Sequence, residues 1–223
     1  MLTIHHLENS RSQRALWMLE ELGLDYELVH HARDPETRFA QAALRAAHPL
    51  GKAPVLCDDD LVIAESGAIL EHLVARYGNG RLVPKPDTPE RCRYVYWMHA
   101  AEGTVMPLLV MRLVFARVRA GAPFVVRPIA RAIAARVDAS YIAPNLEAVI
   151  DAMEAELGRS SWFAGDEFTA ADVQMGYVVE AAAARGAFGA RHPQLRGYLD
   201  RMRKRPAYRA AIARGGPFEV TAD

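Results

Sequence analysis

The chain has little cysteine and no excess of charge of either sign. Its two cysteines, Cys57 and Cys92, are too few for a disulfide scaffold or a cysteine-rich zinc module, and no CxxC pair occurs. Lys plus Arg and Asp plus Glu both number 27, so the formal net charge is zero. No global basic field exists to bind nucleic acid or an anionic membrane, and neither is expected as a partner.

Long apolar segments are also missing. No run of 18 apolar residues occurs, and the opening MLTIHHLENSRSQR lacks the apolar stretch of a signal peptide. A soluble cytoplasmic protein is therefore expected. Hydrophobic residues still make up 51% of the 223 residues and charged residues 24%, which are ordinary values for a globular protein with a real core.

The first eighty residues alternate between strand and helix patterns. Strands are expected at 2–6, 26–30, 54–57 and 61–64, and helices at 12–22 and 66–77, with a short helix near 39–45. Gly23 follows the first helix as a left-handed stop. The acidic turn 58–60 predicts an antiparallel hairpin. The order predicts a small open α/β sheet whose first crossover is right-handed.

After residue 81 the pattern becomes entirely helical. Three prolines within 82–89 indicate a linker, and helices are expected at about 90–119, 124–157, 170–186, 193–204 and 206–213, followed by a tail over 215–223. Pro107, Pro128 and Pro144 fall inside these patterns and should kink or break them. The predicted organisation is a domain over 1–80, a linker over 81–89 and an all-helical domain over 90–223.

One candidate site lies between the first strand and the first helix, in Asn9-Ser10-Arg11-Ser12-Gln13-Arg14. Ligands of open α/β sheets bind outside the carboxyl ends of strands, and a helix N-terminus favours an anion there. A hydroxyl at this turn could donate a hydrogen bond to such an anion. The alternative is that Ser10 or Ser12 only caps the helix, and the residues by themselves favour capping.

Two further signals lie in the same half. Pro54 begins a strand, and a cis bond there would leave the backbone of Ala53 ready to pair with an extended peptide, although a trans bond is the commoner case. Glu65 and Ser66 precede a helix. Together they match the ammonium and carboxylate of an α-amino acid, or else they are a solvated charge and a cap.

Other residues are assigned to structure. Thr169 and Asp172 form the spacing of a capping box, which stabilises a helix start. His5-His6 and His30-His31 are adjacent on strands, so the members of each pair point to opposite faces. No metal site is expected.

The motifs as a set resemble the cytosolic glutathione transferase family over essentially the whole chain. The turn Ser10–Arg14, the Ala53-Pro54 step, Glu65-Ser66 and the Thr169–Asp172 box occur in the family's order. The opening HHLENSRSQRALWMLEELGL with HPLGKAP is similar to a bacterial and fungal branch near the serine classes. The resemblance implies a thioredoxin-like N-terminal domain, an all-helical C-terminal domain and a homodimer.

The resemblance also implies roles for individual residues. Ser10 would donate to the sulfur of glutathione, with Ser12 and Asn9 as rivals for that role. The residues that would hold glutathione itself are Asn9, Lys52, Ala53, a cis Pro54, Glu65 and Ser66, and Glu102 would approach the γ-glutamyl group bound in the partner subunit. Glutathione is then the co-substrate, no metal is needed, and the second substrate is a small hydrophobic electrophile.

Two alternatives keep the fold and change the function. One is glutathione-dependent reduction of peroxides or disulfides at the same site. The other is a non-catalytic binding protein with a vestigial groove. The electrophile pocket is expected to come from the helical domain, with Trp97, Met98, Met106, Met111 and Phe115 as candidates on its first long helix.

Overall fold

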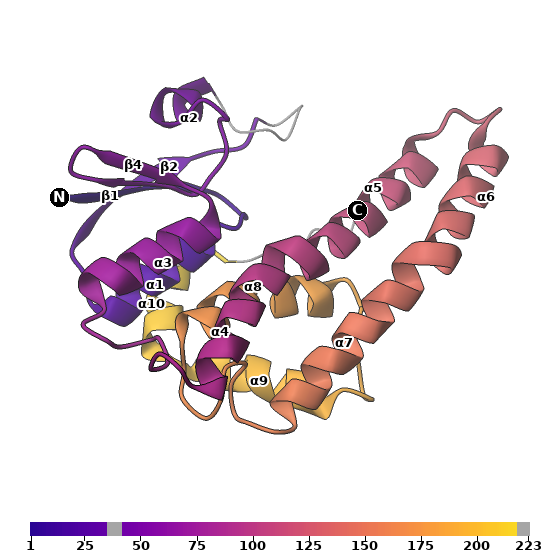
Figure 1. The fold of residues 1–223 in the computed structure, drawn as a ribbon. Coiled ribbons are helices and arrows are strands. Elements are labelled where there is room, and N and C mark those ends of the chain that lie inside the picture. Colours follow the sequence, from indigo (N-terminus) through magenta and orange to yellow (C-terminus); the bar gives the residue numbers. More distant parts are fainter. Residues whose placement is uncertain (35–41, 218–223) are drawn as a thin grey trace.

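The computed structural model describes residues 1–34 and 42–217. A small sheet with its helices lies against a larger body made of helices, and two long helices extend away from that body (Figure 1). Within the described residues, no helix is long and apolar enough to cross a membrane.

The N-terminal part is built on a four-stranded mixed sheet. Its strands are β1 (Leu2–Leu7), β2 (Tyr26–His31), β3 (Val55–Asp58) and β4 (Leu61–Ala64), in the spatial order β2-β1-β3-β4. β1 and β2 are parallel, while β3 is antiparallel to both β1 and β4. The parallel pairing expected from a crossover between the first two strands and the predicted antiparallel hairpin are confirmed.

Three helices accompany the sheet: α1 (Gln13–Leu22), α2 (Ala42–Ala47) and α3 (Ser66–Tyr77). α1 contacts α3 and also α8 (Ala170–Ala184) and α10 (Pro206–Gly215) of the helical body, so most of its side chains are buried. Gly23 ends α1 with a φ of 67°, as predicted. Residues 39–41 of the short helix expected near 39–45 lie outside the described residues, and α2 begins at Ala42.

The helical body begins with two long rods. The first consists of α4 (Pro89–Ala100), a π turn η1 (Ala101–Val105) and α5 (Met106–Gly121). The second consists of α6 (Arg127–Val137), a π turn η2 (Asp138–Ile142) and α7 (Ala143–Leu157). The remaining helices are α8 (Ala170–Ala184), α9 (Pro193–Lys204) and α10 (Pro206–Gly215).

At Pro107 and Pro144 the predicted interruption of the α-helix takes the form of a π turn. Pro107 and Pro144 each lie in the first turn after a π turn. A proline donates no N–H, and the wider turn before it accommodates its ring while the rod continues. Pro128 lies in the first turn of α6, so that helix begins at Arg127 and not at 124.

Both predicted serine caps are wrong. Ser12 occupies the N-cap position of α1, but its side chain makes no capping hydrogen bond. Ser66 is the first residue inside α3, and Glu65 takes the cap position without a side-chain cap. The expectation of a tail from 215 is also wrong at its start, because Gly215 is the last residue of α10 and is buried.

The capping box predicted at the start of α8 is confirmed. The Thr169 N–H donates to Oδ2 of Asp172 at 2.9 Å, and the Phe163 N–H donates to Oδ1 at the same distance. Asp172 is fully buried, and so are Phe163 and the Tyr198 side chain, whose hydroxyl donates to the Asp172 carbonyl. The carboxylate of Asp172 therefore joins the preceding loop to the start of α8, and its backbone carbonyl holds Tyr198 of α9.

We expect Asp172→Ala to lower the free energy of unfolding by at least about 3 kcal/mol, because two buried backbone N–H groups lose their acceptor. Urea denaturation of the purified protein measures the change. Asp166→Ala is the matched control, because Asp166 is exposed and accepts only one backbone bond, from Ser161 at 3.3 Å. Equal losses in the two variants would contradict the assignment.

Candidate active site

Three segments that carry predicted site residues meet at one edge of the sheet. The strand register aligns His5 of β1 with Val55 of β3, and Val55 with Ala64 of β4. Because these strands alternate in direction, the end of β1, the start of β3 and the end of β4 lie in one row. The turn after β1, the Ala53-Pro54 step and Glu65 are therefore neighbours.

A cavity of about 100 Å³ opens at this edge. It brings together six of the nine predicted site residues with four others: Arg11, His48, Leu50, Lys52, Ala53, Pro54, Ala64, Glu65, Ser66 and Glu102. The Ala53–Pro54 bond is cis, as the resemblance implies. The cavity thus carries two cations, two carboxylates and a free stretch of backbone.

The cavity wall includes the start of α3. Glu65 has a φ of 74°, a conformation that a residue with a side chain adopts only when its surroundings impose it. This turn leaves the carboxylate of Glu65 exposed and the hydroxyl of Ser66 buried at the first turn of the helix. Unpaired N–H groups and the helix dipole favour an anion here. An ammonium would pair with Glu65 next to it.

The two serines of the first turn differ in burial. Ser12 is fully buried, whereas Ser10 lies one residue before Arg11 of the cavity wall and keeps 8% of its surface exposed. The two hydroxyl oxygens are 2.7 Å apart. Ser10 and Ser12 do not line the cavity in this structure, and neither does Asn9. Asn9 has a φ of 50°, so it supplies the left-handed turn between β1 and the serines.

A buried histidine sets the direction of the serine hydrogen bonds. Nε2 of His6 lies 2.8 Å from the carbonyl oxygen of Gly215, which can only accept, so Nε2 carries the proton of the neutral ring. Nδ1 then accepts from the Ser12 hydroxyl at 2.8 Å, a closer acceptor than the Leu7 carbonyl at 3.2 Å. With its own proton engaged, the Ser12 oxygen can accept the proton of Ser10 until a ligand competes for it.

The close approach of Gly215 makes this chain of hydrogen bonds possible. A Cβ at position 215 would lie 2.5 Å from Cδ1 of Leu16, 2.7 Å from Oε1 of Gln13 and 3.1 Å from Cε1 of His6, so a larger residue would displace these side chains. Burial lowers the pKa of His6 to about 4, which keeps the ring neutral near pH 7. The end of α10 thereby holds the tautomer of a residue in β1.

A buried arginine lies behind the cavity. Arg14 of α1 is 1% exposed and pairs with Glu102 of η1, which also lies 3.4 Å from Arg11. Nη1 of Arg14 donates to Gln174 at 3.2 Å, and its guanidinium lies 4.9 Å from the ring centre of Tyr177. Burial lowers the pKa of Arg14, and the Glu102 carboxylate opposes this effect. Glu102 is thus fixed at the cavity by two cations of its own chain.

Sequence reasoning missed Arg11, His48 and Leu50 as cavity residues. Arg11 stands between the two serines, so its place in that turn was a usable signal. His48 and Leu50 lie just before Lys52 in the same loop. Both belong to the segment HPLGKAP that carries part of the resemblance, but that segment assigned them no role.

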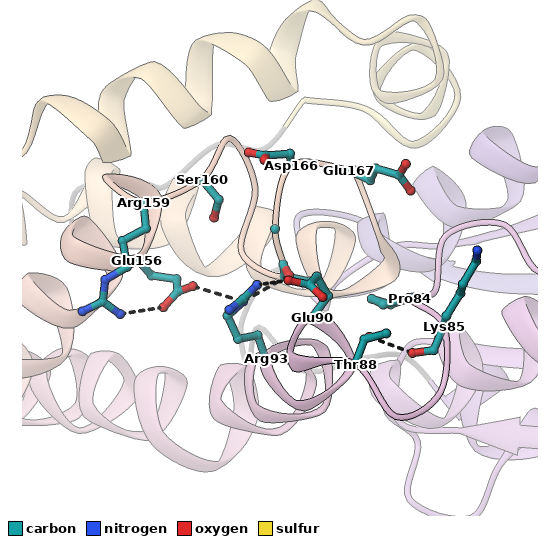
Figure 2. Close-up of a pocket in the computed structure, with 12 residues that line it drawn as sticks. Pro84, Lys85, Thr88, Glu90, Arg93, Glu156, Arg159, Ser160, Asp166 and Glu167 are labelled. Carbon is teal, nitrogen blue, oxygen red and sulfur yellow. Dashed lines mark hydrogen bonds and ion pairs between the residues drawn. The ribbon is translucent and has the colours of Figure 1, made fainter.

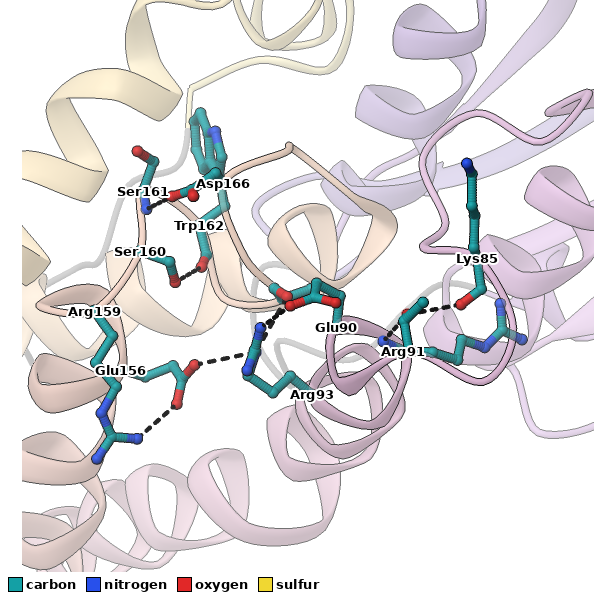
Figure 3. Close-up of polar contacts among 12 residues, drawn as sticks. Lys85, Glu90, Arg91, Arg93, Glu156, Arg159, Ser160, Ser161, Trp162 and Asp166 are labelled. Carbon is teal, nitrogen blue, oxygen red and sulfur yellow. Dashed lines mark hydrogen bonds and ion pairs between the residues drawn. The ribbon is translucent and has the colours of Figure 1, made fainter.

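A larger cavity of about 500 Å³ lies elsewhere, between the segment before α4, the end of α7 and the loop before α8. Four of its charged side chains pair with one another: Arg93 with Glu90 and Glu156, and Glu156 with Arg159 (Figure 2). The loop is held by the bond from the Ser161 N–H to Asp166 and by the Ser160 hydroxyl on the Trp162 carbonyl (Figure 3). It contains no predicted site residue, and we assign its ion pairs to structure.

The candidates for the electrophile pocket divide into two groups. Trp97, Met98 and Met106 are buried in the core, and Met98 also lines a cavity of about 550 Å³ that includes Glu65 and Glu102. Met111 is half-buried against the core, and Phe115 lines a cavity between α5 and α6.

The histidine pairs meet across strands, with Nδ1 of His5 2.9 Å from Nε2 of His31. No cluster of three potential metal ligands occurs in residues 1–34 and 42–217.

The fold and the site together define a class of protein: a thioredoxin-like sheet joined to an all-helical domain, with a polar cavity beside the cis-proline loop. The comparisons with known proteins agree with this class. Residues 4–81 match the model of the glutathione S-transferase N-terminal domain, and residues 129–201 match that of the C-terminal domain.

The chain belongs to the glutathione S-transferase family. It is 37% identical to glutathione S-transferase 3 of Schizosaccharomyces pombe over 182 residues, which cover 82% of this chain and 74% of that protein. A solved glutathione S-transferase from Actinobacillus pleuropneumoniae has 31% identity and a TM-score of 0.81, with 100% and 97% of the two chains covered. A theta class enzyme from Xanthomonas axonopodis pv. citri, solved with glutathione bound, has 26% identity and a TM-score of 0.72, with 98% and 99% covered.

The burial of His6 predicts a pH dependence of stability. Its pKa is about 4 in the folded protein against 6.5 for a free side chain, so the unfolded chain binds more protons between these values. The contribution of His6 to stability therefore falls as the pH is lowered from about 6.5 to about 4, by up to about 3 kcal/mol. Burial raises the pKa of Asp172 to about 6, which acts in the opposite direction over much of the same range. Urea denaturation at several pH values measures the difference between the parent and His6→Gln, and the same pH dependence in both would contradict the assignment.

Proposed function

We propose that this protein activates the thiol of glutathione for attack on small hydrophobic electrophiles, with Ser10 as the hydrogen-bond donor to the sulfur. The observation that carries the proposal is the position of the serines beside the polar cavity. The attacking thiolate forms a carbon–sulfur bond, the leaving group departs with its electron pair, and the thiol proton is released to solvent.

Burial favours Ser10 over Ser12 as the donor. Ser12 is fully buried, and its proton is engaged by His6. Ser10 needs only to turn its proton from Ser12 to the sulfur, and the Ser12 N–H at 3.2 Å still holds the Ser10 oxygen. We assign Ser12 and His6 as positioning residues. Asn9 shapes the turn.

Activation of the thiol requires that the thiolate be stabilised by about 3 kcal/mol. A free thiol with a pKa near 8.5 is only about 3% thiolate at pH 7. Lowering that pKa by about two units gives roughly three-quarters thiolate and corresponds to about 2.7 kcal/mol. A hydroxyl donor and the N-terminus of α1, which begins at Gln13, are each suited to supply part of this stabilisation.

The rest of glutathione fits the cavity by charge. Glu65 would hold the γ-glutamyl ammonium, and Ser66 with the start of α3 its carboxylate. The backbone of Ala53, before cis Pro54, would pair with the cysteinyl unit, and Lys52 would reach the glycine carboxylate. Glu102 lines the same cavity and would assist at the γ-glutamyl end.

The finer features of the resemblance belong to the same proposal. The domain of residues 1–80 would bind glutathione, and the helical domain of residues 90–223 would contribute the electrophile pocket. Residues 81–89 would link the two domains. The electrophile is small and hydrophobic, no metal takes part, and the protein acts in detoxification as a cytosolic homodimer. Sedimentation equilibrium tests the dimer.

Lys52→Ala tests the binding half of the proposal. We expect its dissociation constant for glutathione, measured by titration calorimetry, to rise about tenfold or more, because a charge-assisted hydrogen bond to a carboxylate is lost. Lys85→Ala is the matched control, since Lys85 lies in the other cavity. Equal affinities in the parent and Lys52→Ala would show that the glycine carboxylate is held elsewhere.

Turnover tests the reaction. With glutathione and an activated aryl halide, we expect the parent to release halide and Ser10→Ala to lose at least about tenfold in kcat/KM. Consumption of a hydroperoxide without any reaction of the aryl halide would contradict the conjugating activity and favour glutathione-dependent reduction. Glutathione binding without either reaction would leave only a binding protein.

A further inference from the structure

Helices α5 and α6 and the turn between them form a hairpin with an unusual distribution of charge. Residues 103–137 contain no aspartate, glutamate, lysine or histidine, but six arginines: Arg112, Arg117, Arg119, Arg127, Arg131 and Arg136. The zero net charge of the whole chain therefore hides a strongly basic segment. The acidic residues that balance it lie in other parts of the sequence.

The same hairpin exposes apolar side chains. Phe124 and Val125 in its connecting turn are 83% and 85% exposed, and Ile129 on α6 is 63% exposed. Other exposed apolar residues of the hairpin are Val110, Val114, Val118, Val126 and Ile133. The ends of α5 and α6 extend away from the sheet and from the remaining helices, so this turn is the most protruding part of the helical body (Figure 1).

We propose that the hairpin of residues 110–136, called here the basic hairpin, docks on the surface of an anionic lipid bilayer. Exposed apolar residues at a tip, flanked by arginines and free of carboxylates, suit the interface between headgroups and acyl chains. Phe124 and Val125 would enter the interface, and the arginines would contact the lipid phosphates. This inference does not depend on the proposed enzymatic function.

Charge favours a bilayer over a second copy of the chain. In a symmetric contact through the basic hairpin, the arginine-rich patch would face its own copy and like charges would repel. An anionic lipid surface instead offers the opposite charge at every arginine. Arg112 is held by Asp138 at 3.5 Å and Arg127 by the Ala122 carbonyl, whereas Arg119 and Arg131 are exposed. The last two are therefore the residues to change.

Vesicle sedimentation with the full-length protein tests the proposal. We expect binding to phosphatidylcholine vesicles that contain phosphatidylserine, much weaker binding to pure phosphatidylcholine, and weakening by salt. Arg119→Glu with Arg131→Glu should lower the partition constant at least about tenfold. Phe124→Ser with Val125→Ser should lower it to a similar extent while leaving the net charge unchanged.

Each variant has a control. Arg196→Glu with Lys204→Glu makes the same change in net charge on α9, where both residues are exposed. Leu61→Ser with Val62→Ser removes two exposed apolar side chains from β4. Both control variants should bind the anionic vesicles like the parent. Circular dichroism and the free energy of unfolding check that all variants are folded.

Three results would overturn the proposal. They are no binding to the anionic vesicles, equal loss in the control variants, and loss of self-association in the hairpin variants with vesicle binding unchanged. The last result, read from sedimentation equilibrium, would identify the basic hairpin as an interface between copies. Glutathione binding is measured on the same samples, so that a failure of the active-site proposal is seen separately.

Discussion

The two parts of the molecule depend on one buried guanidinium. Arg14 enters from α1, and its partners, Glu102 and Gln174, come from η1 and α8. An arginine with 1% of its surface exposed must keep a carboxylate, because a buried pair that loses one member costs about 3–5 kcal/mol. This requirement fixes α1 against the helical body. It also places Glu102 at the cavity, where the π turn carries it.

The active site is assembled from parts that are remote in the sequence. The strand register brings the serine turn, the cis-proline loop and Glu65 to one sheet edge. Gly215, more than two hundred residues from His6, supplies the carbonyl that fixes the histidine tautomer. The direction of the Ser12 hydroxyl follows from that contact. A local turn therefore takes its hydrogen-bond pattern from the far end of the chain.

Periodicity and turn residues were enough to predict the strands, most helices and the capping box at Thr169 and Asp172, because these depend on local sequence. The same reasoning placed irregularities at Pro107 and Pro144 but could not give their form, which is a π turn just before the helix that contains each proline. It left Ser10 and Ser12 as alternatives, because the difference in their burial, on which our preference for Ser10 rests, arises only in the folded chain. The pairing of Arg14 with Glu102 was likewise invisible, because 88 residues separate the two.

The most direct measurement is the ultraviolet absorbance of the glutathione thiolate bound to the protein, followed against pH in the parent and in Ser10→Ala. If Ser10 donates to the sulfur, the bound thiol titrates well below the value of about 8.5 for a free thiol, and the substitution returns it toward that value. A bound thiol that titrates near 8.5 in the parent, or a lowered pKa that survives Ser10→Ala, would contradict the account.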